Sequence, residues 1–165
     1  MTDERSEILA ALAKQRSFLC QTVQGLTDQQ ASKRTTTSAL CLSGIVKHVA
    51  RMEGRWVDFI LEGPEVLKFS PDSLASHLES FQVQPGESLA VLLDRYEATA
   101  RRTAEVVGNL PSLDDAQPLP EAPWFPPNAR WSGRTVLFHI LAETAQHSGH
   151  ADIIRESLDG AKTMG

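Results

Sequence analysis

The chain contains little cysteine, no long apolar run and no leader-like N-terminus. Its two cysteines, Cys20 and Cys41, are too few for a disulfide framework and form no Cys-x-x-Cys pair, so we expect two buried thiols in a reducing cytoplasm. No stretch of about eighteen apolar residues occurs, which argues against a membrane-spanning helix. The N-terminus is charged from Asp3 onward and lacks the basic start and apolar run of a secretory signal. These absences predict a cytoplasmic protein.

Positive charge and the common ligand-binding loops are also scarce. Lysine and arginine number 16 against 21 aspartates and glutamates, a net charge of −5, whereas a protein that binds a nucleic-acid backbone needs a surplus of cations. The sequence has no Gly-x-Gly-x-x-Gly or phosphate-binding loop and no Gly-x-Ser-x-Gly elbow. The polar faces of its amphipathic helices carry both signs, which does not favour a membrane surface. We therefore expect a small-molecule substrate, no nucleic acid and no membrane, with a homodimer as one option for assembly.

Helical periodicity dominates what the sequence does contain. Apolar residues recur every three or four positions, and no alternating pattern typical of strands competes with them. A chain of this length predicts one domain, residues 1–165. Four long helices are expected: a first one ending at Gly25, one from the N-cap Ser43 to Glu62, one from Gly86 to Val107 with Gly108 as its terminator, and one from the N-cap Ser132 to Asp159-Gly160. A short turn should begin at Thr27, and a short helix should run from Ser70-Pro71 to Ser80.

A proline-rich region separates the last two long helices. Six of the nine prolines fall within residues 111–127, a density that excludes helix and discourages strands. A loop of this length is usually functional or disordered, and Trp124, Phe125 and Trp131 favour one that packs near the open end of a site. A plain connector held to the surface by its aromatic residues is the alternative. Four long helices with this loop before the last one predict an all-α, antiparallel four-helix bundle.

The candidate chemistry lies on the second and last long helices. Glu143 and His147 are four residues apart and share a largely apolar helical face, where a lone buried glutamate would be unfavourable. A divalent cation bound by these two residues and by the inward-facing His48 would remove that cost. An inward Glu–His ion pair without metal is the alternative. His139 could replace Glu143 and His150 could join the set, although we place the first nearer the bundle end and the second at the rim. We expect His77 to be a surface residue.

Two stretches resemble the DinB/YfiT-like superfamily. Residues 42–56, LSGIVKHVARMEGRW, resemble its second-helix signature, and residues 139–160, HILAETAQHSGHADIIRESLDG, resemble its last-helix signature. The pattern Glu-x-x-x-His-x-Gly-His-Ala-Asp is similar to the branch that includes mycothiol-dependent enzymes, such as maleylpyruvate isomerase and mycothiol S-transferases. The resemblance extends over nearly the whole chain, and the proline-rich region is its least familiar part.

The resemblance implies a four-helix bundle with a divalent metal at one end. Its ligands are a histidine of the second helix and two residues four apart on the last helix. In this sequence those positions are His48, Glu143 and His147, the set that the spacing had already indicated. His150 stands where many relatives have glutamine, so we do not expect it to be a ligand. Zinc is the expected metal, with nickel and iron as alternatives.

Two functions are consistent with this expected site. In the first, a metal with an open position lowers the pKa of the thiol of a small mycothiol-like cofactor, which then serves S-transfer or a thiol-assisted isomerisation. Metal-activated water in a hydrolase is a related option. In the second, the chain is a non-enzymatic, stress-associated metal-binding bundle. The sequence leaves the thiol, the electrophile and any catalytic acid unassigned.

Overall fold

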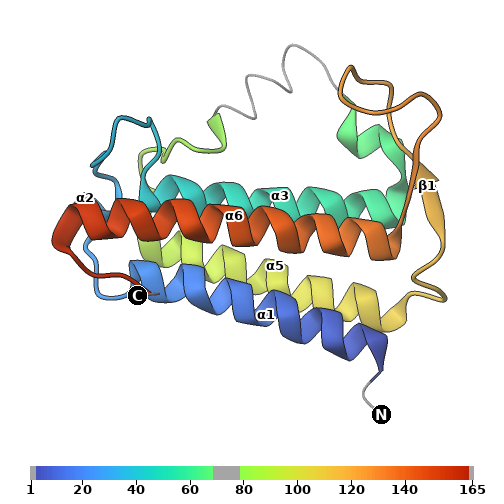
Figure 1. Ribbon diagram of the computed structural model, residues 1–165, viewed down its shortest axis with the longest axis horizontal. Coiled ribbons are helices and arrows are strands. Elements are labelled where there is room, and N and C mark those ends of the chain that lie inside the picture. Colours follow the sequence, from blue (N-terminus) through green and yellow to red (C-terminus); the bar gives the residue numbers. More distant parts are fainter. Residues whose placement is uncertain (1–2, 69–78, 164–165) are drawn as a thin grey trace.

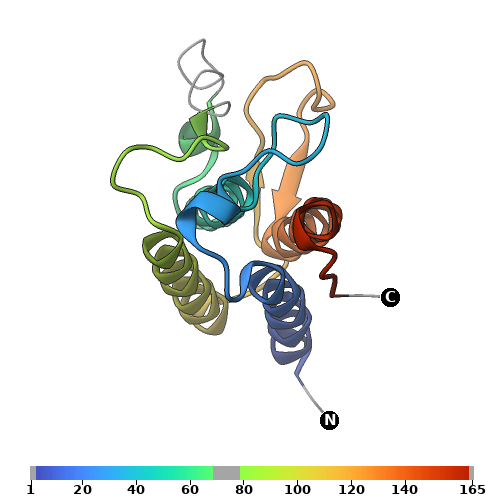
Figure 2. The same cartoon turned by 90° about the vertical axis from the view of Figure 1, so that its left-hand side faces the viewer.

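The computed structural model describes residues 3–68 and 79–163 and consists mainly of four long helices that run side by side (Figure 1). Seen end-on, these helices surround a common core (Figure 2). The elements are α1 (Glu4–Val23), α2 (Asp28–Ala31), α3 (Leu42–Glu62), the 3-10 helix η1 (Pro64–Leu67), α5 (Leu89–Asn109), β1 (Ala116–Pro118), β2 (Arg130–Ser132) and α6 (Gly133–Asp159). The predicted all-α four-helix bundle is confirmed. The short helix predicted from Ser70-Pro71 falls almost entirely outside the described residues.

The helix directions explain why one connection must be long. The chain colours show that α1 and α6 run one way and that α3 and α5 run the other way (Figure 1). Since α3 and α5 begin at the same end, the connection over residues 63–88 has to return along a helix of roughly 30 Å. The last residues of this connection reach the N-terminal half of α3, which carries His48.

Several helix ends follow the predicted capping residues. The Ser132 side chain accepts a hydrogen bond from a backbone N–H in the first turn of α6, and Gly160 ends that helix with a left-handed φ of +81°. Thr27 and Gln30 form a capping box on α2, in which each side chain accepts from the other residue's backbone N–H. Gly63, with φ +83°, ends α3. Each of these residues supplies a local conformation or acceptor that the sequence alone identifies.

Three other predicted helix boundaries are wrong. The N-cap of α3 is Cys41, and Ser43 lies inside the helix and is buried. An N-cap side chain contributes only about 1 kcal/mol, so packing of the helix start against the core overrides it. Gly86 has φ +87° and stays outside α5, which is capped by the Ser88 side chain. Gly108 lies within α5, which continues to Asn109 rather than ending at Val107.

The two cysteines differ in burial. Cys41 is buried, whereas Cys20 lies on α1 and is exposed, so the prediction of two buried thiols is wrong for Cys20. Neighbouring residues on a helix point about 100° apart, and the adjacent Leu19 takes the buried position. Partial desolvation still raises the pKa of the Cys20 thiol, which leaves it protonated at neutral pH.

A polar layer divides the core into two apolar clusters. Arg16, Glu53, Thr103 and Thr144 come from the middle of the four long helices, and the last three are fully buried. Met52 packs against both apolar clusters. Central members of the first cluster are Leu19, Leu42, Ile45, Leu92, Tyr96 and Ile154, and those of the second are Leu12, Phe59, Val107, Val136, Leu137 and Ile140.

A small β ladder closes the base of the proline-rich region. The strands β1 and β2 pair antiparallel, with Gln117 opposite Trp131, and Leu119 donates a further backbone hydrogen bond to Ala129 at 2.8 Å. The prediction of no sheet larger than two short strands holds for the described residues. Among these residues, none of the helices combines the length and the apolar character that crossing a bilayer requires.

Candidate metal centre

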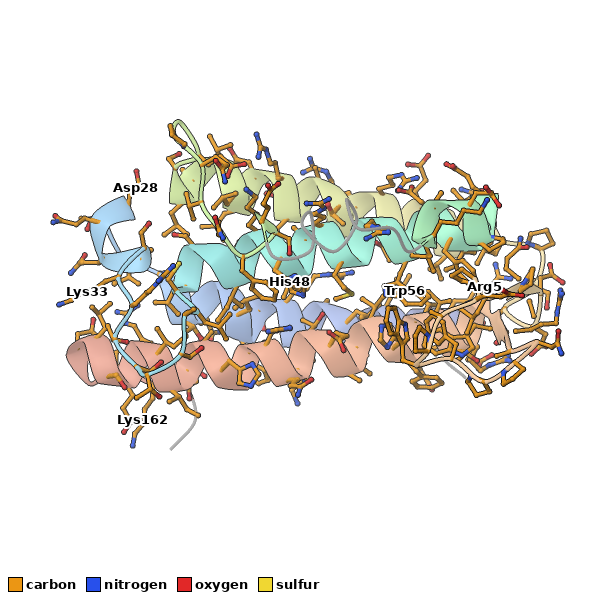
Figure 3. The ribbon with its side chains drawn as sticks, turned by 90° about the horizontal axis from the view of Figure 1, so that it is seen from above. Arg5, Asp28, Lys33, His48, Trp56 and Lys162 are labelled. Carbon is orange, nitrogen blue, oxygen red and sulfur yellow. The ribbon has the colours of Figure 1, made fainter. Side chains whose placement is uncertain are left out.

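Three donors meet between α3 and α6. His48 of α3 and Glu143 and His147 of α6 each offer one ligand atom, and all three atoms lie within 4.8 Å of one another. Two donors of one zinc ion lie at most about 4.4 Å apart, so small side-chain rotations would bring this set onto a single ion. His48 lies on α3 beside α6, partway along the bundle rather than at its tip (Figure 3). The expected position at one end of the bundle is therefore wrong.

The two donors of α6 stack one turn apart, as their spacing predicts. Glu143 Oε2 lies 3.8 Å from His147 Nε2. The side chain of Glu143 is 30% exposed and that of His147 is 11% exposed, so the expected burial of Glu143 is wrong. Glu143 therefore lies at the edge of the α3–α6 interface and is partly exposed to solvent.

The donor set fits a divalent cation. His48 Nδ1 lies 2.8 Å from Ser80 Oγ, and both residues are buried, so Nε2 is the ring nitrogen outside this contact and the candidate metal ligand. Among the described residues, no lysine or arginine lies within ion-pair distance of Glu143. Two imidazoles and one carboxylate suit zinc, nickel or ferrous iron.

Two other described histidines, His139 and His150, lie outside this set. The ring of His150 lies 5.4 Å from that of His147, and its buried Nδ1 has no hydrogen-bond partner within the described part of the chain. His139 instead contacts Trp56 and Trp131, with ring centroids 4.7 and 5.1 Å away. Burial lowers the pKa of His139 below that of a free histidine. His77 lies outside the described residues.

Aromatic side chains of the proline-rich region pack beside this site. Trp131 stacks on Trp56 of α3 at a centroid distance of 4.9 Å, and Phe125 packs against Trp131 at 5.7 Å. Their partner His139 lies one turn before Glu143 on α6. Trp124, which is 59% exposed, contacts Phe125 and lies at the outer edge of this aromatic cluster. In Figure 3 this region lies toward the end of the bundle near Trp56, whereas His48 lies farther along α3.

Comparison with known proteins identifies the family of this chain. The family model of mycothiol-S-transferases matches residues 7–160, which is nearly the whole chain. This chain belongs to the mycothiol-S-transferase family. The fold of this chain is similar to that of a conserved protein from Enterococcus faecalis whose structure has been solved, with a TM-score of 0.68 and 13% identity. The match covers 98% of this chain and 100% of the E. faecalis chain. No curated protein matches this chain. The resemblance to the DinB/YfiT-like superfamily is thereby confirmed.

Sequence reasoning missed two residues that pack against this candidate site. Ser80 and Phe81 both contact His48. The ring centroid of Phe81 also lies 5.7 Å from that of His147. Ser80 and Phe81 lie at and just after the end of the short helix predicted from Ser70-Pro71 to Ser80, and no repeating pattern in the sequence relates that segment to α3. The one available signal was Gly44, since a glycine inside an amphipathic helix often marks a close backbone approach.

Proposed function

We propose that this family member binds a divalent metal, zinc first among the candidates, through His48, Glu143 and His147. We further propose that it transfers a low-molecular-weight thiol of the mycothiol kind to an electrophilic substrate. The convergence of the three donors, in a chain of the mycothiol-S-transferase family, carries this proposal. A divalent cation at these donors would lower the pKa of a thiol bound to it, so that the thiol loses its proton near neutral pH.

The protein's own residues would hold the metal and form the surroundings of the site. His48 and His147 supply neutral donors, and Glu143 supplies the negative charge that offsets part of a cation's charge. Trp56 and Trp131 form an apolar wall one turn or more from the donors, which suits a substrate with an apolar body. Because burial favours the neutral form of His139, this wall gains little positive charge at neutral pH.

The first test measures metal content and turnover together. The purified protein is stripped of metal, reloaded with zinc, nickel or iron, and assayed with mycothiol, glutathione or no thiol against a halogenated aromatic electrophile. Thiol consumption should require metal and should be greatest with the preferred thiol. His147→Ala should lose metal and turnover together, whereas His77→Ala, which leaves the three proposed donors unchanged, should change neither.

Other outcomes identify the alternatives. Stoichiometric zinc without turnover of any thiol would favour the non-enzymatic metal-binding bundle. Product formation that needs metal but no thiol would favour a hydrolase, and conversion of an unsaturated substrate without net thiol consumption would favour the isomerase. Full metal occupancy in His147→Ala would exclude the donor set itself.

A further inference from the structure

Ser80 and Phe81 contact His48 from two directions. Ser80 Oγ lies 2.8 Å from Nδ1, and the Phe81 ring stacks on the imidazole face at a centroid distance of 3.8 Å and an angle of 15°. We propose that Ser80 and Phe81 are positioning residues of the metal centre and that Gly44 is required to seat them on α3. This inference rests on the proposed function, because it assigns these residues a role toward the metal that His48 binds.

The contact with Ser80 selects the nitrogen that faces the donors. When Nδ1–H of the neutral His48 ring donates to Ser80 Oγ, the lone pair of the ring is on Nε2. Both residues are almost fully buried, with exposed fractions of 5% and 2%, so water does not readily replace the hydroxyl. A hydrogen bond of this kind to a metal-binding histidine fixes both its tautomer and its orientation before the metal arrives.

The stacked ring of Phe81 restricts the remaining motion of His48. A ring pair at 3.8 Å and 15° leaves no room for the imidazole to turn about its Cβ–Cγ bond without moving Phe81. The same phenylalanine lies 5.7 Å from the His147 ring. Phe81 therefore packs against ligands from both helices, and its position affects their separation.

Gly44 allows this segment to lie directly on α3, one turn before His48. A Cβ at residue 44 would lie 2.2 Å from the carbonyl oxygen of Phe81 and 3.1 Å from its carbonyl carbon. These are backbone atoms, so a side chain at residue 44 would force the segment away from the helix. Lys47 Nζ holds the next residue by donating to the Gln82 carbonyl at 2.8 Å.

The first experiment removes the hydroxyl and leaves all ligands intact. In metal-free wild-type protein, nitrogen NMR should find His48 in its Nδ1–H tautomer, and Ser80→Ala should populate the other tautomer. Zinc affinity, measured by competition with a chromophoric chelator, should fall about 10- to 100-fold in Ser80→Ala. Ser80→Thr, which keeps a hydroxyl, should recover most of this loss. Ser43→Ala is the matched control. It removes a different buried hydroxyl, on α3, that has no partner among the described residues.

The second experiment moves the segment without touching Ser80, Phe81 or any ligand. Gly44→Ala should weaken zinc binding at least tenfold and broaden the absorption bands of the cobalt-substituted protein, because the ligands lose their fixed orientation. Gly54→Ala is the control on the same helix, because its Cβ would meet nothing closer than Thr99 Cγ2 at 4.0 Å. It should bind zinc as wild type does.

The results separate this inference from the proposed function. Wild-type zinc affinity in both Ser80→Ala and Gly44→Ala would overturn the inference while leaving the donor set intact. Failure of Ser80→Thr to recover affinity would assign the effect to packing and overturn the role of the hydrogen bond. If the wild-type protein bound no zinc, the proposed function and the metal role of both residues would fall together. The tautomer measurement would then still decide whether Ser80 holds His48.

Discussion

Two glutamates of the bundle, Glu53 and Glu143, differ in how the negative charge of the carboxylate is compensated. Glu53 is fully buried, and its carboxylate accepts from Arg16 Nε at 3.1 Å, from Arg16 Nη2 at 2.5 Å and from Thr103 Oγ1 at 2.5 Å. Glu143 lies at the edge of the interface and has two histidines, His147 and His48, beside it. The chain itself neutralises the first carboxylate. The second lies beside two imidazoles and has no lysine or arginine partner among the described residues, an arrangement that suits a cation from outside.

The geometry of α3 keeps these two regions apart. His48 and Glu53 are five residues apart, which places them about 140° apart around the helix. Glu53 faces α1 and α5, where Arg16 and Thr103 are found, and His48 faces α6 and the Ser80–Phe81 segment. Closely spaced polar residues on one helix therefore serve a closed structural network and an open ligand set.

The largest expected effect comes from breaking the closed network. Glu53→Ala leaves Arg16 almost buried without its carboxylate, so we expect the free energy of unfolding to fall by about 3–5 kcal/mol. Urea unfolding of metal-free protein measures this loss. The folded fraction should still bind zinc with wild-type stoichiometry. A loss of zinc binding in that fraction would show that the two regions are coupled.

The second effect concerns stabilisation by the metal. Zinc at 100 times its dissociation constant should raise the free energy of unfolding of the wild-type protein by about 2.7 kcal/mol, because only the folded state assembles the donors. At the same free zinc concentration, His147→Ala should show almost none of this increase. Thermal unfolding with and without a chelator provides the measurement. An unchanged increase in the variant would place the zinc elsewhere.

A smaller effect is expected for Glu143 in the metal-free protein. Glu143→Gln keeps the shape of a partly exposed side chain that has no lysine or arginine partner in the described structure, so its unfolding free energy should change by less than about 0.5 kcal/mol. With zinc present, the same variant should lose most of the metal stabilisation. A large loss in metal-free protein would instead assign Glu143 a structural role like that of Glu53.

The pH dependence should show the smallest effect and involves His139. Its pKa lies below the ordinary 6.5 because burial disfavours the charged ring. The unfolded chain thus binds this proton more readily, and stability is lost as the pH falls below about 6.5. Metal-free His139→Gln should lose less stability than wild type between pH 7.5 and 5.5, as measured by urea unfolding. Equal losses would mean that His139 has an ordinary pKa in the folded state.

The features predictable from the sequence are those with a local or periodic cause. The ends of α6 at Ser132 and Gly160 follow from capping chemistry, and the shared face of Glu143 and His147 follows from the helical repeat. The start of α3 was not predictable in this way, because tertiary packing outweighs one capping side chain.

Long-range pairings could not be predicted from the sequence for a different reason. Arg16 and Glu53 are 37 residues apart and Ser80 is 32 residues from His48, and neither pairing leaves a repeating pattern. Each depends on the path of a connection between helices. The closeness of His48, Glu143 and His147 could be predicted, because it needs only a shared face on α6 and an inward position on α3.

The β1–β2 ladder makes residues 119–129 an exchangeable part of the molecule. The backbone pairing fixes both ends of this segment, and doubling the length of a loop closed at its base costs only about 0.6 kcal/mol. Insertions, deletions or grafted sequences can thus accumulate between Leu119 and Ala129 while α3 and α6 keep their register. Homologues and laboratory libraries can vary Trp124 and Phe125 here without changing His48, Glu143 or His147.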